Sequence, residues 1–241
     1  MNESARAAFF DVDETLITAK SMFDFLHSWI VDRGGEEEEY AAVMRQVHAM
    51  AASGTDRTEI NRFYYRRFAG VSQRELTAAA RAWYDAYRLR PDGFVRATVS
   101  ALRAHVAAGD TVVLVSGSFR GCLEPLTGDL PAHRILCSEP LVDGDGLLTG
   151  EVERPMIGTA KGQALGETVR ELGFAFEDCH AYGDHASDLT MLTQVGHPHA
   201  VGADPVLDEY AVRLGWDRLP AAPAALAELD GLYERQPAVA S

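Results

Sequence analysis

The sequence predicts an α/β fold in which a mostly parallel sheet carries one all-helical insertion. Two observations lead to this prediction. Short apolar strands alternate with helices over the C-terminal part of the chain, and such alternation requires crossover connections between parallel strands. Between the first strand and this alternating part, about seventy residues show only helical spacing.

The first strand is predicted at residues 7–13, where an apolar run ends in aspartate. Apolar residues then recur at helical spacing as far as Tyr87. We expect residues 19–90 to form a helical cap domain, because an insertion after a strand's carboxyl end lies over the ligand-binding edge of a sheet. The aromatic residues expected mostly in the cap core are Phe25, Trp29, Phe63, Tyr64 and Trp83.

Strands and helices alternate after residue 90. The elements expected are a helix at 95–106 stopped by Gly109, a strand at 111–115, a hairpin at 135–152 turned at Asp-Gly-Asp-Gly, a helix at 161–172 ended by Gly173, strands within 179–184 and 199–205, and a helix capped by Asp204. We expect residues 1–18 and 91–232 to form a Rossmann-like core with a mostly parallel sheet, and residues 233–241 to form a flexible tail.

Composition excludes several classes of protein. The net charge is −14, so we expect no nucleic-acid partner, since phosphate backbones are bound by basic surfaces. No apolar run approaches the roughly 18 residues of a membrane helix, and no secretory signal is visible. Three scattered cysteines are typical of reduced thiols. These observations predict a cytoplasmic protein without a membrane association.

The first predicted strand ends in crowded acids. Asp11, Asp13 and Glu14 lie within four positions, and Asp11 and Asp13 share a face because strand side chains alternate. Like charges this close raise a pKa unless a cation intervenes. Taken alone, the acids are also compatible with a turn that caps a helix.

Three further polar groups stand at strand ends or at a helix start. Ser116 and Gly117 follow the second predicted strand, Lys161 opens a helix, and Asp184 and Asp188 follow a later strand. Each alone has an ordinary explanation: a plain loop, a solvated lysine, or a helix cap. Together they belong to one edge of a parallel sheet, where the carboxyl ends of the strands converge. Oxygen ligands gathered beside an anion-binding loop favour Mg²⁺ and a phosphate group.

The motifs DVDETL (11–16), VSGS (115–118) and GDHASD (183–188), together with Lys161, resemble those of the haloacid dehalogenase superfamily of phosphohydrolases. A helical cap between the first two motifs is similar to the phosphoserine-phosphatase-like subclass. The resemblance implies a Mg²⁺-dependent phosphomonoesterase that hydrolyses a small phosphorylated metabolite through an aspartyl-phosphate. Members that cleave carbon–halogen bonds lack the second acid, so Asp13 favours phosphoester hydrolysis.

The resemblance also implies roles for single residues. Asp11 would be the nucleophile, and Asp13 the general acid that protonates the leaving oxygen and then the base that activates water. Ser116 and the Gly117 amide would hold phosphoryl oxygens. Lys161 would neutralise the nucleophile and the phosphate.

A second set of implied roles concerns the metal. Mg²⁺ would be bound by Asp11, by the main-chain carbonyl of Asp13 and by Asp184. Thr15 would fix the loop of the first motif. Asp188 would anchor Lys161 or the metal-bound waters from outside the ligand shell.

Two positions depart from the phosphoserine-specific pattern. Those enzymes place a glutamate for the substrate amine where this chain has Lys20, which argues against phosphoserine as the substrate. Lys20 either meets an anionic or hydroxyl-bearing group of the substrate or is solvated at the cap hinge. His185 stands where a small residue is common, and it either contacts substrate or faces solvent.

Other basic residues have two interpretations as well. Arg62, Arg66 and Arg67 could steer a phosphate ester, although such a run is more typical of a solvated helix face. Four histidines, His180, His185, His197 and His199, are close in sequence but interrupted by proline, which disfavours a shared zinc ion.

Two other functions are compatible with the same motifs. In a phosphotransferase or mutase, a hydroxyl rather than water would take the phosphoryl group. In a non-catalytic phosphate-binding module, Asp11 would be phosphorylated without turnover, and Asp13 argues against this function. The sequence leaves the identity of the substrate and the oligomeric state open.

Overall fold

The computed structural model describes residues 6–233, so most of the predicted tail lies outside the described residues. The main sheet has six strands in the order β4-β3-β1-β7-β8-β9. Every neighbouring pair in it is parallel, which confirms the predicted α/β class. The strands are β1 (Ala7–Phe10), β3 (Thr111–Ser116), β4 (Arg134–Cys137), β7 (His180–Gly183), β8 (His197–Val201) and β9 (Asp217–Leu219).

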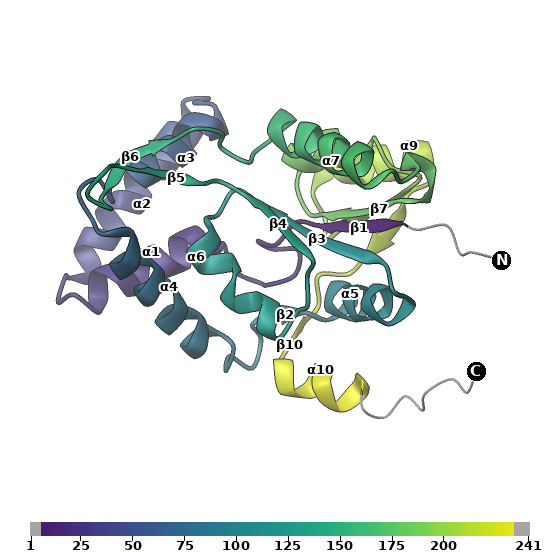
Figure 1. Ribbon diagram of the computed structural model, residues 1–241, viewed down its shortest axis with the longest axis horizontal. Helices are drawn as coiled ribbons and strands as arrows, with labels where there is room; N and C mark the ends of the chain where they lie inside the picture. The colour runs from purple at the N-terminus through teal and green to yellow at the C-terminus, as the bar shows by residue number, and fades with distance from the viewer. Residues whose placement is uncertain (1–5, 234–241) are drawn as a thin grey trace.

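Helices cover both faces of this sheet (Figure 1). Ala7 and Phe9 of β1 pack in one core cluster with α7 (Thr159–Leu172) and α9 (Pro205–Leu214), whereas Ala8 and Phe10 pack with α5 (Arg96–Ala108) on the other face. All four β1 side chains are fully buried. This pattern explains why β1 is a continuous apolar run: a strand covered on both faces has no side that water can reach.

Four helices follow β1 and lie beside the sheet domain (Figure 1). They are α1 (Ser21–Val31), α2 (Glu37–Ala52), α3 (Arg57–Arg66) and α4 (Gln73–Tyr87), and all fall within the predicted insertion. Phe25, Tyr64 and Trp83 are buried in one cluster that continues into the α5 face of the sheet. The aromatic residues of the cap therefore mostly form its core, as predicted, while the domain boundaries stay a prediction.

The structure confirms the turn of the hairpin predicted at residues 135–152, but the prediction of its first strand is wrong. β4 (Arg134–Cys137) pairs in parallel with β3 and belongs to the main sheet. The antiparallel hairpin consists of β5 (Pro140–Val142) and β6 (Leu148–Val152) only. Local sequence shows that a strand is present, but its partner is set by packing with residues far along the chain. The hairpin lies against the cap, where the Leu148 carbonyl accepts the Gly70 N–H at 2.7 Å.

Smaller elements complete the fold. β2 (Phe94–Val95) and β10 (Pro223–Ala224) form a two-stranded antiparallel pair. Val95 is thus a strand residue rather than the helix start expected from the sequence. The other short elements are α6 (Arg120–Leu123), α8 (Leu189–Leu192), α10 (Leu226–Tyr233) and 3₁₀ turns at Pro125–Gly128, Phe176–Asp178 and Ala186–Asp188. None of the helices within residues 6–233 combines the length and apolar character of a membrane span.

Histidines and a tyrosine form a stack on the sheet face beneath α5. His180 Nδ1 lies 3.2 Å from His199 Nε2, and the His199 ring stacks on Tyr182 with 4.2 Å between ring centroids. Burial, followed by the neighbouring His105, lowers the pKa of His180 to about 3. Burial likewise lowers the pKa of His199 to about 4. Both rings are therefore neutral in the folded protein at neutral pH.

Acid should destabilise the protein through this stack. Below the ordinary histidine pKa of about 6.5, His180 and His199 bind protons in the unfolded chain but not in the folded one. The contribution of these two rings to the free energy of unfolding should therefore fall as the pH drops from about 6.5 to about 4, by up to about 1.4 kcal/mol per pH unit for each ring, whereas the raised pKa values of Asp13 and Asp184 act in the opposite direction. Urea unfolding at pH 7, 6 and 5 measures this slope.

His180→Gln removes one of the two titrating rings and should flatten the slope accordingly. The free energy of unfolding of this variant is also measured at pH 8, where any loss of packing appears without a contribution from protonation. Equal slopes for wild type and variant would contradict the prediction.

Candidate active site

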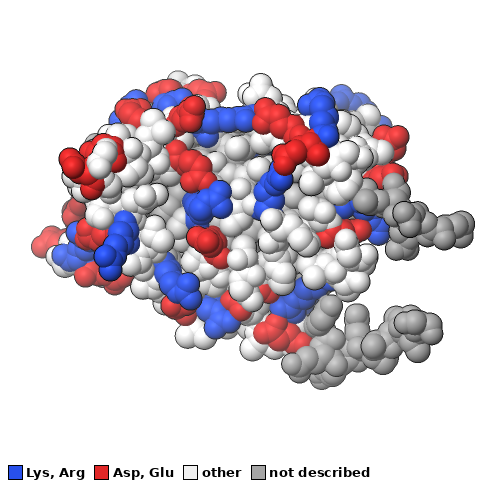
Figure 2. All heavy atoms as spheres, in the orientation of Figure 1, with Lys and Arg blue, Asp and Glu red and all other residues white. Residues whose placement is uncertain are grey.

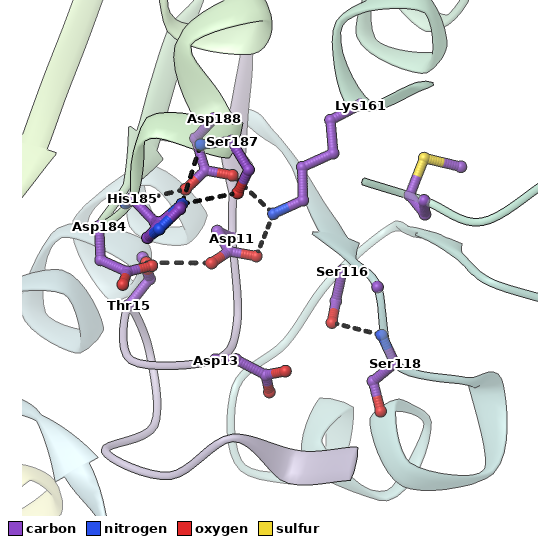
Figure 3. Close-up of polar contacts among 12 residues, drawn as sticks. Asp11, Asp13, Thr15, Ser116, Ser118, Lys161, Asp184, His185, Ser187 and Asp188 are labelled. Carbon is purple, nitrogen blue, oxygen red and sulfur yellow. Dashed lines mark hydrogen bonds and ion pairs between the residues drawn. The ribbon is translucent and has the colours of Figure 1, made fainter. Parts of the chain in front are cut away.

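The predicted site residues meet at the carboxyl edge of the sheet (Figure 3). Asp11 directly follows β1, Ser116 ends β3, and Asp184 directly follows β7. Lys161 lies in the first turn of α7. Residues that are up to 173 positions apart in the sequence thus share one site because their strands are parallel neighbours.

Lys161 is held by two carboxylates inside the protein. Its Nζ lies 2.6 Å from Asp11 Oδ1 and 2.7 Å from Asp188 Oδ1. The three residues are at most 5% exposed. Burial alone would lower the pKa of Lys161, but Asp11 and Asp188 outweigh it and raise that pKa above its ordinary value. The ammonium is therefore charged, and the paired carboxylates compensate its loss of hydration.

Asp184 brings a third carboxylate to the same place. The Thr15 hydroxyl lies 3.1 Å from Asp184 Oδ1 and 3.3 Å from Asp11 Oδ2, so it bridges the first and last motifs. Asp11, Asp184 and Asp188 each offer one oxygen, and these oxygens all lie within 4.8 Å of one another. Burial, together with the charges of Asp11 and Asp188, raises the pKa of Asp184 to about 9.

This donor set fits a divalent cation. One ammonium among three carboxylates leaves two negative charges when all the acids are ionised, and the raised pKa of Asp184 shows how strongly that state is disfavoured without further compensation. The ligands are all oxygens, which suits Mg²⁺ or Ca²⁺ rather than a soft metal. The residues present therefore fit Mg²⁺ in charge and chemistry, while the predicted ligand set with the Asp13 carbonyl stays a prediction.

The loop after β1 presents Asp13 to the cavity. The Val12 carbonyl accepts N–H bonds from three successive residues, which makes a tight turn. Glu14 has a φ of 59°, a left-handed conformation that costs energy for a residue with a side chain. Asp13 Oδ1 accepts the Ser21 N–H at 3.0 Å, at the start of α1. Burial and the nearby Asp11 raise the pKa of Asp13 to about 6.

Ser116 is the last residue of β3, and Gly117 begins the loop that follows. The Ser116 hydroxyl oxygen accepts the Ser118 N–H at 3.0 Å, and Gly117 lines the cavity. Two side chains of α3 hold the Gly117 carbonyl: Asn61 Nδ2 donates at 2.9 Å and the Tyr65 hydroxyl at 3.2 Å. The cap thereby orients the peptide at which the phosphate group is expected.

The cavity at this edge has a volume of about 80 Å³. Lys20 lies on its wall and forms an ion pair with Glu14 at 3.1 Å. His185 lines the same cavity and caps the turn that carries Asp188 by accepting the Ser187 N–H at 3.0 Å. Both residues that the sequence left open thus border the site, although each also has a partner within the protein. The residues lining the cavity are Asp11, Asp13, Glu14, Lys20, Met22, Phe23, Arg57, Gly117, Ile157, Lys161, Asp184, His185 and Ser187.

Arg57 borders the site and was missed by the sequence analysis. It begins α3, lines the cavity, and places a guanidinium nitrogen 2.7 Å from His185 Nδ1. The sequence did carry a signal for Arg57, because a cation in the first turn of a helix opposes the helix dipole. The same reasoning singled out Lys161. The three arginines considered instead lie outside the cavity lining: Arg62 donates to the Val152 carbonyl, Arg66 pairs with Glu151, and Arg67 bonds Gln46.

Both the sequence and the fold of this chain are similar to those of known proteins. The family profile of haloacid dehalogenase-like hydrolases matches residues 8–193. The "Inhibition of morphological differentiation protein" of Streptomyces azureus is 32% identical over 223 residues, which cover 87% of this chain and 76% of the relative. A phosphoserine phosphatase of Halobacterium salinarum is 32% identical over 201 residues, covering 81% and 84%. A solved structure of a protein of unknown function from Bordetella pertussis Tohama I superposes with a TM-score of 0.78 at 26% identity, covering 90% and 99%.

Removal of the Lys161 charge should destabilise the fold. Lys161→Met leaves Asp11 and Asp188 buried without their cation, and breaking a buried ion pair in this way costs about 3–5 kcal/mol. Urea unfolding at neutral pH without added metal measures the loss. Lys20→Met is the matched control, since the same substitution removes only an exposed ion pair, worth about 1 kcal/mol or less. Losses of equal size in the two variants would contradict this account of the buried charges.

Proposed function

Since this chain belongs to the haloacid dehalogenase-like hydrolase family, we propose that it is a cytoplasmic, Mg²⁺-dependent phosphatase that hydrolyses a small phosphorylated metabolite through an aspartyl-phosphate on Asp11. Its enzyme class is that of a hydrolase acting on phosphoric monoesters. The observation that carries the proposal is the Asp11 carboxylate, which faces a small cavity between Lys161 and Asp184. The three cysteines are buried and unpaired, which suits a reducing compartment.

Asp11 is the proposed nucleophile. A carboxylate oxygen of Asp11 attacks phosphorus, the aspartyl P–O bond forms, and the P–O bond to the alcohol oxygen breaks. Lys161 and the Thr15 hydroxyl contact the two oxygens of Asp11 and fix the carboxylate in one orientation. Positioning of this kind, with charge stabilisation, accounts for most of phosphoryl-transfer catalysis.

Asp13 is the proposed acid and base. As a carboxylic acid, it gives its proton to the leaving alcohol oxygen in the first step. As a carboxylate, it takes a proton from water in the second step, while the water oxygen attacks phosphorus and the bond to Asp11 breaks. Its position supports this role, because the Ser21 N–H holds one oxygen of Asp13 at the cavity and the acid has a raised pKa.

Asp11, Asp184 and the main-chain carbonyl of Asp13 are the proposed ligands of Mg²⁺, and Asp188 supports the site from its contact with Lys161. When bound, the ion supplies positive charge that offsets the negative charge of the carboxylates and of the phosphoryl oxygens. Ser116 and the Gly117 amide are proposed to donate to those oxygens at the end of β3. In this proposal the carboxyl edge of the sheet would provide the nucleophile, the acid and the phosphate-binding groups.

The proposed partner is a small molecule rather than a nucleic acid. On the face drawn in Figure 2, basic and acidic side chains are interspersed and form no continuous basic patch. The net charge of −14 would oppose binding to a phosphate backbone.

Loss of the Asp11 nucleophile should abolish turnover. Asp11→Asn keeps the shape of the side chain but removes its nucleophilic carboxylate, so phosphate release from 4-nitrophenyl phosphate should fall by at least about 10³-fold. Chelation of divalent cations should abolish release by the wild type, and added Mg²⁺ should restore it. Asp145→Asn, an exposed acid in the hairpin turn, is the matched control and should keep full activity. Persistent release by Asp11→Asn, with circular dichroism showing an intact fold, would refute the proposed nucleophile.

Lys20 should disfavour phosphoserine as a substrate. Its ammonium borders the cavity, where the ammonium of phosphoserine would meet a like charge. Lys20→Glu should raise kcat/KM for phosphoserine relative to 4-nitrophenyl phosphate by at least about tenfold, equivalent to about 1.4 kcal/mol. Lys20→Gln separates removal of the positive charge from addition of a negative one. An unchanged substrate ranking in both variants would place Lys20 outside substrate recognition.

A further inference from the structure

A second cavity lies beside the catalytic one. Its volume is about 360 Å³, compared with about 80 Å³ for the catalytic cavity. The two cavities share a set of lining residues, which we call the neck: Lys20, Met22, Phe23, Arg57, Ile157 and His185. One water molecule needs only about 10–15 Å³, so the second cavity has room for an organic group.

Apolar side chains of the cap line most of this second cavity. Met44, Val47, His48 and Ala51 occupy one face of α2, at the spacing i, i+3, i+4 and i+7. Phe23 and Ile60 add apolar surface from α1 and α3, and all three helices belong to the predicted cap. Phe23, Met44 and Ile60 are only partly buried in the protein itself, so a bound ligand would cover them. We call this space the apolar cavity.

The polar groups of the apolar cavity carry positive charge or none. Lys20 and Arg57 stand at the neck, and among the described residues that line the cavity none is an aspartate or a glutamate. Asn61 donates its amide N–H to the Gly117 carbonyl, while its buried Oδ1 has no hydrogen-bond partner among the described residues. A substrate ammonium would therefore face two cations and no carboxylate, with only neutral acceptors nearby, so its burial here would be costly. An apolar group meets no such penalty.

We propose that the substrate is a phosphate monoester whose alcohol has an apolar alkyl or aryl body, with the phosphoryl group in the catalytic cavity and the body in the apolar cavity. This inference rests on the phosphatase function proposed above. The neck orients the ester, because its two cations attract the phosphoryl end and the apolar cavity takes the uncharged end. Met22 and Met44 are flexible side chains that adapt to bodies of different shape.

A chain-length series tests the inference. Ethyl, butyl and hexyl phosphate differ only in the apolar body, and each buried methylene contributes about 0.8 kcal/mol, or roughly a fourfold gain in kcat/KM, until the cavity is filled. Phenyl phosphate, compared with hexyl phosphate, separates an aryl from an alkyl preference. Phosphoserine should be the poorest substrate of the panel.

The possible results separate the inference from the function on which it rests. Equal kcat/KM values across the alkyl series, or a preference for phosphoserine, would overturn the apolar substrate class and leave the phosphatase function intact. Failure to release phosphate from every ester in the presence of Mg²⁺ would overturn both.

A cavity-filling variant locates the apolar body. Ala51 is exposed and lines the apolar cavity, so Ala51→Trp places an indole there without disturbing the buried core. The ratio of kcat/KM for hexyl phosphate to that for ethyl phosphate should fall at least about tenfold in Ala51→Trp. Ala49→Trp is the matched control, because Ala49 is exposed on the same helix but lies outside the cavity lining. An unchanged ratio in Ala51→Trp, or an equal fall in both variants, would overturn the placement.

Discussion

The buried contacts of Lys161 with Asp11 and Asp188 are the interaction on which the active site depends. They join the end of β1, the first turn of α7 and the turn after β7 through two bonds of 2.6 and 2.7 Å. Because the ammonium compensates only part of the carboxylate charge around it, the same cluster that fixes these three segments is also the proposed site of a further cation. Stability and the proposed metal binding thus have one physical origin at this edge of the sheet.

Helix α3 connects the cap to this cluster. On one side, Asn61 and Tyr65 hold the Gly117 carbonyl, and Arg57 contacts His185 in the turn before Asp188. On the other side, Arg62 donates to the Val152 carbonyl of the β5–β6 hairpin at 2.7 Å. The helix is therefore held between the catalytic loops and a hairpin that comes from the core part of the sequence. A cap fixed in this way determines which groups border the catalytic cavity, so in the proposed function one helix would influence both substrate choice and phosphate binding.

The sequence best predicted those site residues that stand at the ends of parallel strands. Asp11, Ser116 and Asp184 were predictable because each follows an apolar strand, and parallel strands bring such positions together. Arg57 was not found: its place in the first turn of α3 is a local signal, but its position beside the site depends on where this cap helix docks, which tertiary packing decides. The first strand of the predicted hairpin failed for the same reason: residues 135–137 are strand-like in any context, and only pairing with β3 decides their sheet. No motif could have predicted the apolar cavity, because side chains from three helices and from the separate loops at Lys20, Ile157 and His185 form it.

The placement of the chain's two lysines bears on how a substrate would be oriented. The chain has 22 basic residues, of which only Lys20 and Lys161 are lysines, and both line the catalytic cavity. An ammonium is a compact point charge, whereas a guanidinium is broad and planar, so lysine suits a cavity of about 80 Å³ that must also hold a phosphoryl group. The two lysines thus lie at the catalytic end and at the neck, while apolar side chains make up most of the wall beyond. If the chain acts on phosphate esters as proposed, such an ester would bind with its ester oxygen between the two cavities and its phosphorus toward Asp11.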